Sequence, residues 1–200
     1  MKRLWFAIIV LVALSSCEKK ISDFQSSNFV KFFGSGSGSR GFDVTELPTG
    51  YLAVGYDNIE GVDNQFFVIR TDRAGNTVWQ KWFGNELANE AYAVQVEGEE
   101  YFACGLSTDD TGTISSHIVH LNSQGDSLGC LSVSGDGYSI AINDFAIYGS
   151  SIVVVGETYQ NSAAQPDYFI DEYSFEGDPQ WNNSGVYGAD GSSQSFKKVF

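Results

Sequence analysis

The segment Lys31-Phe32-Phe33-Gly34 recurs fifty positions later as Lys81-Trp82-Phe83-Gly84. A second signature, an apolar run that ends in glycine, recurs at nearly the same interval and ends at Gly55, Gly105 and Gly156. A chain with this period consists of one supersecondary unit copied several times, and each copy buries its apolar faces against its neighbours. A period near fifty residues points to a solenoid or a propeller.

Each unit contains four short apolar segments, which we label a to d in chain order. The 22 glycines and 14% aromatic residues favour strands and turns over helices. Between segments c and d, a polar residue is followed three positions later by Gly75, Gly125 or Gly177, which suits a hairpin whose glycine takes a positive φ. The expected strands are a at 42–44, 92–96 and 145–147, b at 51–55, 101–105 and 152–156, c at 66–69, 117–121 and 168–170, and d around Trp79, Gly129 and Trp181.

A unit of about fifty residues with four strands resembles a β-propeller blade. The chain resembles bacterial lipoprotein propellers over about residues 28–200, with repeat boundaries near 34, 84, 135 and 188. The interval from turn to tryptophan is similar to the docking motif of quinoprotein-type propellers. It departs from that motif because Asp72 to Trp79 is one residue shorter and the second repeat has Gly129 in place of the tryptophan. The resemblance implies an all-β propeller in which Trp79 locks neighbouring blades.

Three complete units are flanked by single strands. We expect Phe29–Phe33 to be a lone strand d and Phe196–Phe200 a lone strand a. Because four blades are the usual minimum of a closed ring, three units leave the ring incomplete. We therefore expect either a truncated piece of a longer propeller, which we favour, or a ring completed by association.

Residues 1–16 have the order of a lipoprotein signal peptide. Lys2 and Arg3 precede an apolar run from Leu4 to Leu14, which is too short to span a bilayer comfortably. Leu14-Ser15-Ser16-Cys17 resembles a lipobox, which implies cleavage between Ser16 and Cys17 and a diacylglycerol thioether with a further N-acyl chain, commonly palmitate, on Cys17. Residues 17–27 would be a polar tether. The alternative is an ordinary secretory signal with an incidental cysteine.

The net charge and the residues after Cys17 indicate which partners and which location are expected. The full chain carries −14, and loss of Lys2 and Arg3 leaves the mature chain at −16, which disfavours nucleic acid. Surface-exported lipoproteins of some Gram-negative groups carry an acidic cluster after the lipidated cysteine, and Glu18-Lys19-Lys20 is not one. We expect an outer-membrane protein that faces the periplasm.

Two cysteines remain in the repeats, and strand order keeps them apart. Cys104 lies on a strand b and Cys130 on the strand d of the same unit, with strand c between them. Strands lie about 4.8 Å apart and a disulfide needs Cα atoms within about 7 Å, so we expect two free thiols, both buried.

Gly125-Asp126-Ser127-Leu128-Gly129 resembles the serine strings of esterases. Such a serine requires a strand-to-helix turn and a downstream histidine. The string occupies the turn between strands c and d, and no histidine follows Ser127. A hairpin turn is the favoured interpretation.

The other polar candidates are also weak. His117 and His120 are three apart on a strand, so they point to opposite faces, and we expect one packed and one exposed imidazole rather than a metal site. The loops at 57–64 and 109–112 offer oxygens for Ca²⁺, as do Asn85-Glu86 and Asn89-Glu90, but they do not match a calcium loop and solvated turns are favoured.

Two further patterns have structural interpretations. Trp79, Trp82, Phe83 and Tyr92 could stack on carbohydrate, but strand spacing favours core between units. The glycine-serine segment at 34–38 lacks the ending of a phosphate loop and indicates a flexible connection.

Function is expected to be binding rather than catalysis. The sequence predicts a lipid-anchored, non-catalytic interaction module of the cell envelope with a protein or glycan partner, and no catalytic residue, metal or cofactor is assigned. The alternative is a propeller-type enzyme, either a quinoprotein-like oxidoreductase or a glycan-active protein, whose site lies partly outside this chain. Enzymatic propellers place polar groups on strands a, where this chain offers Asp43, Gln95 and Asp144 without a histidine or arginine set.

Overall fold

The computed structural model describes residues 30–36, 38–60, 63–84, 89–133, 139–159, 166–176 and 185–187. Residues 185–187 are described by their backbone alone. The predictions for the signal peptide, Ser16, Cys17, Trp181 and residues 196–200 lie outside these ranges. In the described ranges, no helix has the length and apolar character needed to cross a membrane.

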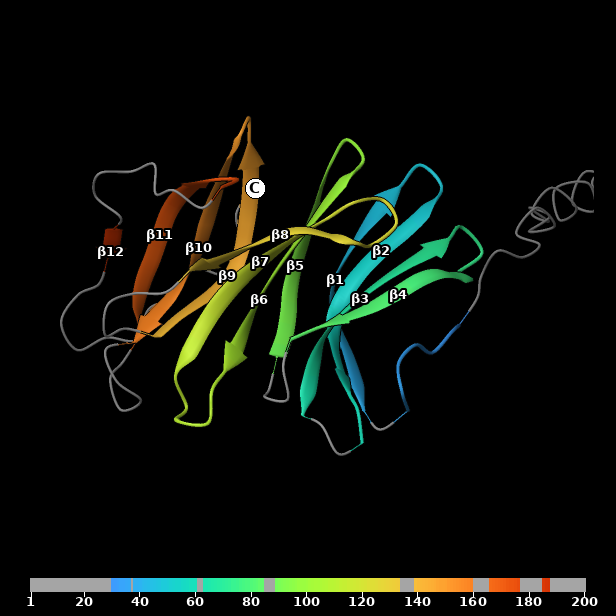
Figure 1. Ribbon diagram of the computed structural model, residues 1–200, viewed down its shortest axis with the longest axis horizontal. Helices are drawn as coiled ribbons and strands as arrows, with labels where there is room; N and C mark the ends of the chain where they lie inside the picture. The colour runs from blue at the N-terminus through green and yellow to red at the C-terminus, as the bar shows by residue number, and fades with distance from the viewer. Residues whose placement is uncertain are drawn as a thin grey trace, which may run out of the picture. The chain divides into compact units, whose positions relative to one another are not determined.

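The described part of the chain is all-β, as the sequence predicts. Its strands form three antiparallel sheets of four strands each, in strict chain order within each sheet (Figure 1). The first sheet contains β1 (Ser39–Leu47), β2 (Gly50–Asn58), β3 (Asn64–Asp72) and β4 (Thr77–Phe83). The second contains β5 (Asn89–Glu97), β6 (Glu100–Thr108), β7 (Ile114–Leu121) and β8 (Ser127–Val133). The third contains β9 (Ser139–Tyr148), β10 (Ser151–Tyr159), β11 (Asp167–Ser174) and the short β12 (Gly185–Tyr187).

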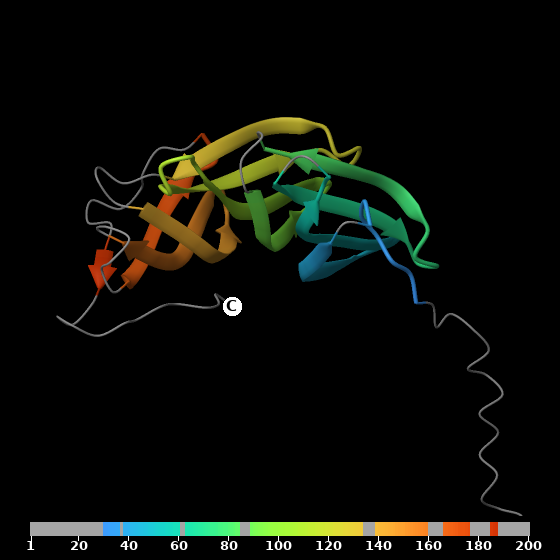
Figure 2. The same cartoon turned by 90° about the horizontal axis from the view of Figure 1, so that it is seen from below.

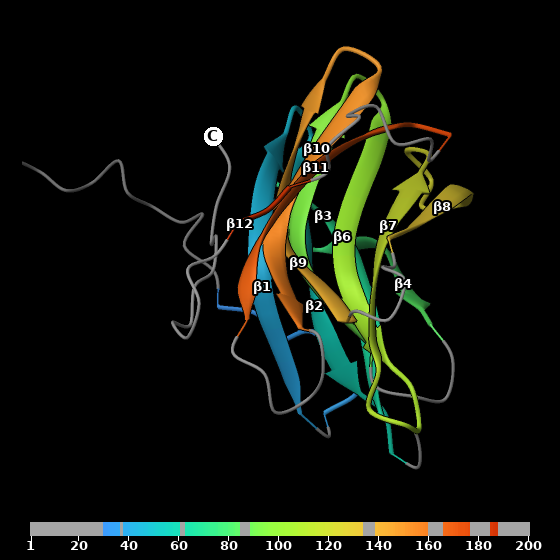
Figure 3. The ribbon, with the colours of Figure 1, turned by 90° about the vertical axis from the view of Figure 1, so that its left-hand side faces the viewer.

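Equivalent strands of the three sheets lie on the same side. The first strands are neighbours, since β1 contacts β5 and β5 contacts β9. Figure 2 shows β4 and β8 along the opposite side, and Figure 3 looks along the row of sheets with β9 to β11 in front. Repetition in the sequence is therefore repetition of whole sheets, each packed face to face on the next.

Alternate residues of the second sheet serve two different cores. On β6, Tyr101 and Ala103 pack toward the first sheet, whereas Phe102 and Cys104 pack toward the third. Side chains of a strand alternate between its faces, so a strand covered on both faces reads as a continuous apolar run. Each fully buried large side chain, such as Phe102, contributes about 1.5–3 kcal/mol to stability.

The recurring glycine of the second strand is explained by a β-bulge in the first strand. In the first sheet the register shifts between Gly41 and Asp43, so that Phe42 is the extra residue. The bulge brings the carbonyl oxygen of Arg40 so close that a Cβ built on Gly55 would lie 1.8 Å from it. Any side chain at Gly55 would displace this strand. Gly105 and Gly156 meet the carbonyl oxygens of Glu90 and Ala141 in the same way, both at 2.0 Å, beside bulges at Tyr92 and Asn143.

The predicted hairpin turn between the third and fourth strands is confirmed. Gly75 has a φ of 73°, and Asp72 Oδ1 accepts the backbone N–H groups of Ala74 and Asn76, both at 2.8 Å. A carboxylate that binds its own turn holds the chain reversal without outside contacts. The equivalent turn of the second sheet uses the Asn122 side chain and Gly125, whose φ is 79°.

Trp79 joins the first two sheets. Its indole Nε1 on β4 donates a hydrogen bond of 3.1 Å to the carbonyl oxygen of Ser123, in the β7–β8 turn. Arg70 Nη1 donates to the same oxygen at 3.0 Å. These two hydrogen bonds link β3 and β4 of the first sheet to the β7–β8 turn of the second.

The predicted strand at 29–33 is wrong over its described residues. Residues 30–33 are not in a strand, and the side chains of Val30 and Phe32 are 85% and 94% exposed. The reason is that no described strand pairs with this segment. Lys31 nevertheless makes the contact of its repeat equivalent, since Lys31 Nζ donates to Asn76 Oδ1 at 2.5 Å and Lys81 Nζ donates to Asp126 Oδ1 at 3.3 Å.

Candidate functional site

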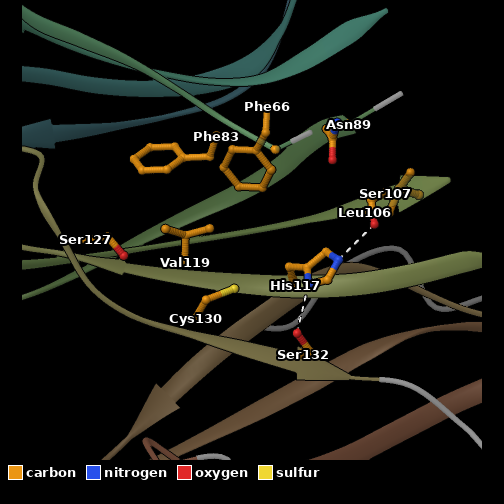
Figure 4. A pocket seen from close by; sticks show the side chains of 11 residues that line it. Phe66, Phe83, Asn89, Leu106, Ser107, His117, Val119, Ser127, Cys130 and Ser132 are labelled. Carbon is orange, nitrogen blue, oxygen red and sulfur yellow. Dashed lines mark hydrogen bonds between the residues drawn. The ribbon is translucent and has the colours of Figure 1, made fainter. Parts of the chain in front are cut away.

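A pocket of about 410 Å³ lies between the first and second sheets (Figure 4). Its wall from the first sheet includes Phe66 and Phe83. Its wall from the second sheet includes Val119 and His117 of β7 and Cys130 of β8. A volume of this size with an apolar lining and a few convergent polar groups is typical of a small-molecule site. We refer to it as the inter-sheet pocket.

Three polar side chains form a chain along one wall of the inter-sheet pocket. His117 Nε2 lies 2.8 Å from Ser107 Oγ, and His117 Nδ1 lies 3.1 Å from Ser132 Oγ (Figure 4). Burial lowers the pKa of His117, so the imidazole is neutral at pH 7. A neutral ring has one donor and one acceptor nitrogen, so one serine donates to the ring and the other accepts from it. Both hydroxyls keep lone pairs for a further partner.

Cys130 corrects the expectation of two buried thiols. Cys104 and Cys130 are both free, as predicted, and Cys104 is buried, but Cys130 is exposed. The reason is that β8 is an edge strand with a neighbouring strand on one side only. Partial desolvation still raises the pKa of the Cys130 thiol, although its hydrogen bond with Ser132 acts in the opposite direction.

The esterase-like string is a turn followed by the start of a strand, as predicted. Ser127 is the first residue of β8, and its Oγ donates to the carbonyl oxygen of Gly129 at 3.4 Å. Ser127 does line the inter-sheet pocket, but Val119 and Cys130 lie between it and His117 (Figure 4). The serines that contact His117 are Ser107 and Ser132, which the sequence reasoning did not single out.

The two histidines differ from expectation in their exposure. Both are half-buried, so the prediction of one packed and one exposed imidazole is wrong. His120 is covered because its ring stacks on Phe102 with a centroid separation of 4.3 Å, while its Nε2 lies 2.9 Å from Glu100 Oε2. In the described residues, no group of three or more His, Cys, Asp or Glu side chains could hold a metal ion.

The loop aspartates serve the fold in two different ways. Asp57 is not in a solvated turn as predicted but is buried at the end of β2, where it accepts hydrogen bonds from Ser35, Ser39 and Trp82. Asp109 lies in an exposed turn as predicted, and its Oδ1 accepts the backbone N–H groups of Thr111 and Thr113.

Of the two Asn-Glu pairs between the first and second sheets, the structure describes only Asn89-Glu90. Asn85-Glu86 lies outside the described residues. Asn89 and Glu90 begin β5, so this pair is in a strand rather than a solvated turn. Glu90 accepts hydrogen bonds from Asn64 Nδ2 at 2.8 Å and from the Tyr92 hydroxyl at 2.7 Å.

Asp43 of the first strand binds the backbone of the neighbouring sheet. Asp43 Oδ2 accepts the N–H of Val94, on the first strand of the next sheet, at 3.0 Å. Asp144 occupies the equivalent position of β9 and is buried. The acidic residue at position 43 therefore has a structural role, because its carboxylate joins the first sheet to the second.

Trp79 and Tyr92 of the aromatic pattern pack on rings of another sheet, whereas Phe83 packs on a cross-strand neighbour in its own sheet. Phe83 packs on Phe66, and Trp79 on Tyr101, with ring separations of 6.2 and 6.3 Å. The third, Tyr92, packs on Phe42 at 4.9 Å. Trp82 differs because 40% of its surface is exposed.

Comparison with known proteins gives no assignment. No protein-family model matches the chain, and a search of curated proteins finds no match.

Proposed function

We propose that this chain is a lipid-anchored, non-catalytic binding module of the bacterial cell envelope, with β-propeller architecture. The observation that carries the binding role is the inter-sheet pocket, in which apolar walls converge with the Ser107–His117–Ser132 chain. Such a mixed lining fixes the orientation of a ligand while its apolar surface is buried.

The propeller part of the proposal is supported by repetition of the sheets. The three sheets have the same strand order, and β1, β5 and β9 are neighbours on one side, as the inner strands of blades would be. The Trp79 contact with the β7–β8 turn adds a lock of the kind found between blades. The ring itself, its number of blades and its completion belong to the proposal. An experimental structure of the full reading frame tests it, and a row of sheets that does not curve into a ring would contradict it.

The anchor part rests on the sequence around Cys17. Labelling of the protein with an alkyne fatty acid in cells, followed by membrane fractionation, tests this part. We expect label and outer-membrane localisation in the wild type, and loss of both in Cys17→Ala. A labelled Cys17→Ala protein would contradict the proposal.

The enzyme alternative has one observation in its favour, which is the contact of Ser107 with His117 at 2.8 Å. A serine beside a neutral imidazole is the first requirement of a nucleophilic site. The two functions differ in their response to Ser107→Ala. Loss of a hydrolytic activity found with envelope esters or glycans would favour the enzyme, whereas altered ligand affinity without turnover favours the binding module.

The test of the binding function uses the mature protein purified from its native envelope. Native mass spectrometry identifies small molecules that remain bound, and Ser132→Trp is the matched variant because it places a bulky ring in the pocket. We expect a bound molecule in the wild type and not in the variant. The same set of molecules in both proteins, or none in either, would contradict the proposal.

A further inference from the structure

Three residues that line the inter-sheet pocket have repeat equivalents in the first sheet, where a side chain fills the corresponding space. In the second sheet, His117 pairs with Gly105 on one side and with Ser132 on the other. In the first sheet, Phe67 pairs with Gly55 and with Trp82 in the same register. Because Gly55 and Gly105 are repeat equivalents, Phe67 corresponds to His117 and Trp82 to Ser132. Asp57 and Ser107, each two residues after its glycine, also correspond.

In the first sheet these positions hold an indole. The Trp82 ring packs on Phe67, with ring centroids 5.4 Å apart and planes inclined by 41°. Trp82 Nε1 donates a hydrogen bond of 2.9 Å to Asp57 Oδ2. The ring therefore has a flat apolar partner on one face and an acceptor at its N–H edge, which is the arrangement that a partly buried tryptophan requires.

In the second sheet the equivalent positions lack the indole ring but still provide a flat ring and a hydrogen-bond acceptor. Ser132 replaces the indole by a hydroxymethyl group, His117 replaces Phe67 by another flat ring, and Ser107 replaces Asp57 by another acceptor. All three line the inter-sheet pocket (Figure 4). A cavity left where a large side chain is missing binds small molecules of the missing shape.

Charge separates the two sites. Asp57 presents a carboxylate to the indole of Trp82, whereas none of the described residues that line the inter-sheet pocket is Asp, Glu, Lys or Arg. A charged ligand would lose hydration there without gaining an ion pair, so a neutral ligand is favoured. The Ser107 hydroxyl has two lone pairs and can accept from a ligand N–H while it stays bonded to His117.

We propose that the inter-sheet pocket binds a neutral planar aromatic group with an N–H on its edge, an indole or a close heteroaromatic relative. The ring stacks on His117 as the Trp82 ring packs on Phe67, and its N–H donates to Ser107. This inference rests on the proposed binding function and specifies its ligand class.

The test uses indole as the probe, with indene as the isosteric control that has CH₂ in place of N–H. Titration followed by ligand-observed NMR or calorimetry should show one saturable site for indole on the full mature protein. A single neutral hydrogen bond makes indole bind about fivefold more tightly than indene. Ser107→Ala should remove this preference and leave indene affinity unchanged. Equal affinities of indole and indene for the wild type would overturn the proposed N–H contact.

Two exchange variants make the test specific. Ser132→Trp transfers the indole of the first sheet into the second and should abolish indole binding, while Tyr148→Trp, at a residue of the third sheet that is 79% exposed, should leave it unchanged. Trp82→Ser should create a second indole site and raise the stoichiometry from one to two. If Trp82→Ser unfolds, the Ser107→Ala comparison alone decides the inference.

The outcomes separate this inference from the proposed function. Failure of indole to bind, while another small molecule binds the wild type and not Ser132→Trp, would overturn the aromatic ligand and leave the binding function intact. Failure of every tested molecule to respond to Ser132→Trp would contradict both. Indole binding that Ser132→Trp abolishes and Tyr148→Trp preserves supports both.

Discussion

The ring of Trp79 lies against Gly125 so closely that a Cβ built on the glycine would come within 3.0 Å of three ring carbons. Gly125 is the turn glycine of the second sheet, and Trp79 is on the edge strand of the first. The turn of the second sheet and the tryptophan of the first therefore pack directly on each other.

Gly125→Ala should destabilise the protein more than Gly112→Ala. Both glycines have a φ near 80°, at 79° and 82°, but a Cβ on Gly112 meets nothing within 4 Å. The strain of a left-handed backbone costs about 1 kcal/mol in each variant. Overpacking against Trp79 adds about 1–2 kcal/mol at Gly125 only. Urea unfolding measures both variants, and equal losses would show that the ring yields to the new methyl group.

Substitution of Trp79 should separate its hydrogen bond from its packing. Trp79→Phe loses the bond to Ser123 and should cost about 1 kcal/mol. Trp79→Ala loses the ring as well and should cost about 3 kcal/mol, since the ring is only half-buried. The control is Val78→Ala, because Val78 is 54% exposed and should change stability by less than about 0.5 kcal/mol. The same loss in the Phe and Ala variants would exclude a packing role for the ring.

The network around Asp57 should make stability depend on pH in the acid range. Burial alone would raise the pKa of Asp57, but hydrogen bonds from Ser35, Ser39 and Trp82 lower it below its ordinary value of 3.8. A lowered folded pKa means that the stabilisation is fully present above pH 3.8 and is lost as the pH falls through the folded pKa.

Asp57→Asn should be less stable than the wild type at neutral pH, and the difference should shrink as the pH falls from about 5 to 2. Thermal unfolding across this range measures it. The exposed Asp110→Asn is the matched control and should follow the wild type. A difference between Asp57→Asn and the wild type that stays constant down to pH 2 would contradict the prediction.

The two cysteines of the repeats should react in two stages. Cys130 is exposed and should be alkylated in the native protein, although its raised pKa calls for mildly alkaline buffer. Cys104 is buried and burial raises its pKa, so it should react only after unfolding. Peptide mass spectrometry without reductant reads both sites, and a disulfide between them or alkylation of native Cys104 would refute this description.

Prediction from the sequence succeeds at positions where all three repeats have the same residue. The recurrence of Gly55, Gly105 and Gly156 predicts the second strand of every sheet correctly. The bulge that requires these glycines lies in a different strand, whose sequence varies from Phe42 to Tyr92 to Asn143, so pattern alone does not reveal it.

Prediction fails where the repeats differ. Ser132 lines the inter-sheet pocket where the preceding repeat has Trp82, a difference that averaging over repeats removes. Comparison of repeats for a large residue replaced by a small one would have found it. The predicted burial of Cys130 is wrong because burial depends on the place of a strand in its sheet, and β8 lies at an edge.

The position of the inter-sheet pocket has a consequence for how the chain unfolds. Stability in a row of repeated units is the sum of each unit's own stability and its coupling to the next unit. The inter-sheet pocket leaves part of the joint between the first and second sheets without packing contacts, beside the buried cluster that these two sheets share. A bound ligand would restore the missing contacts and raise the free energy of separating the two sheets. Occupancy of the pocket would then strengthen the coupling between the unfolding of the first sheet and that of the second.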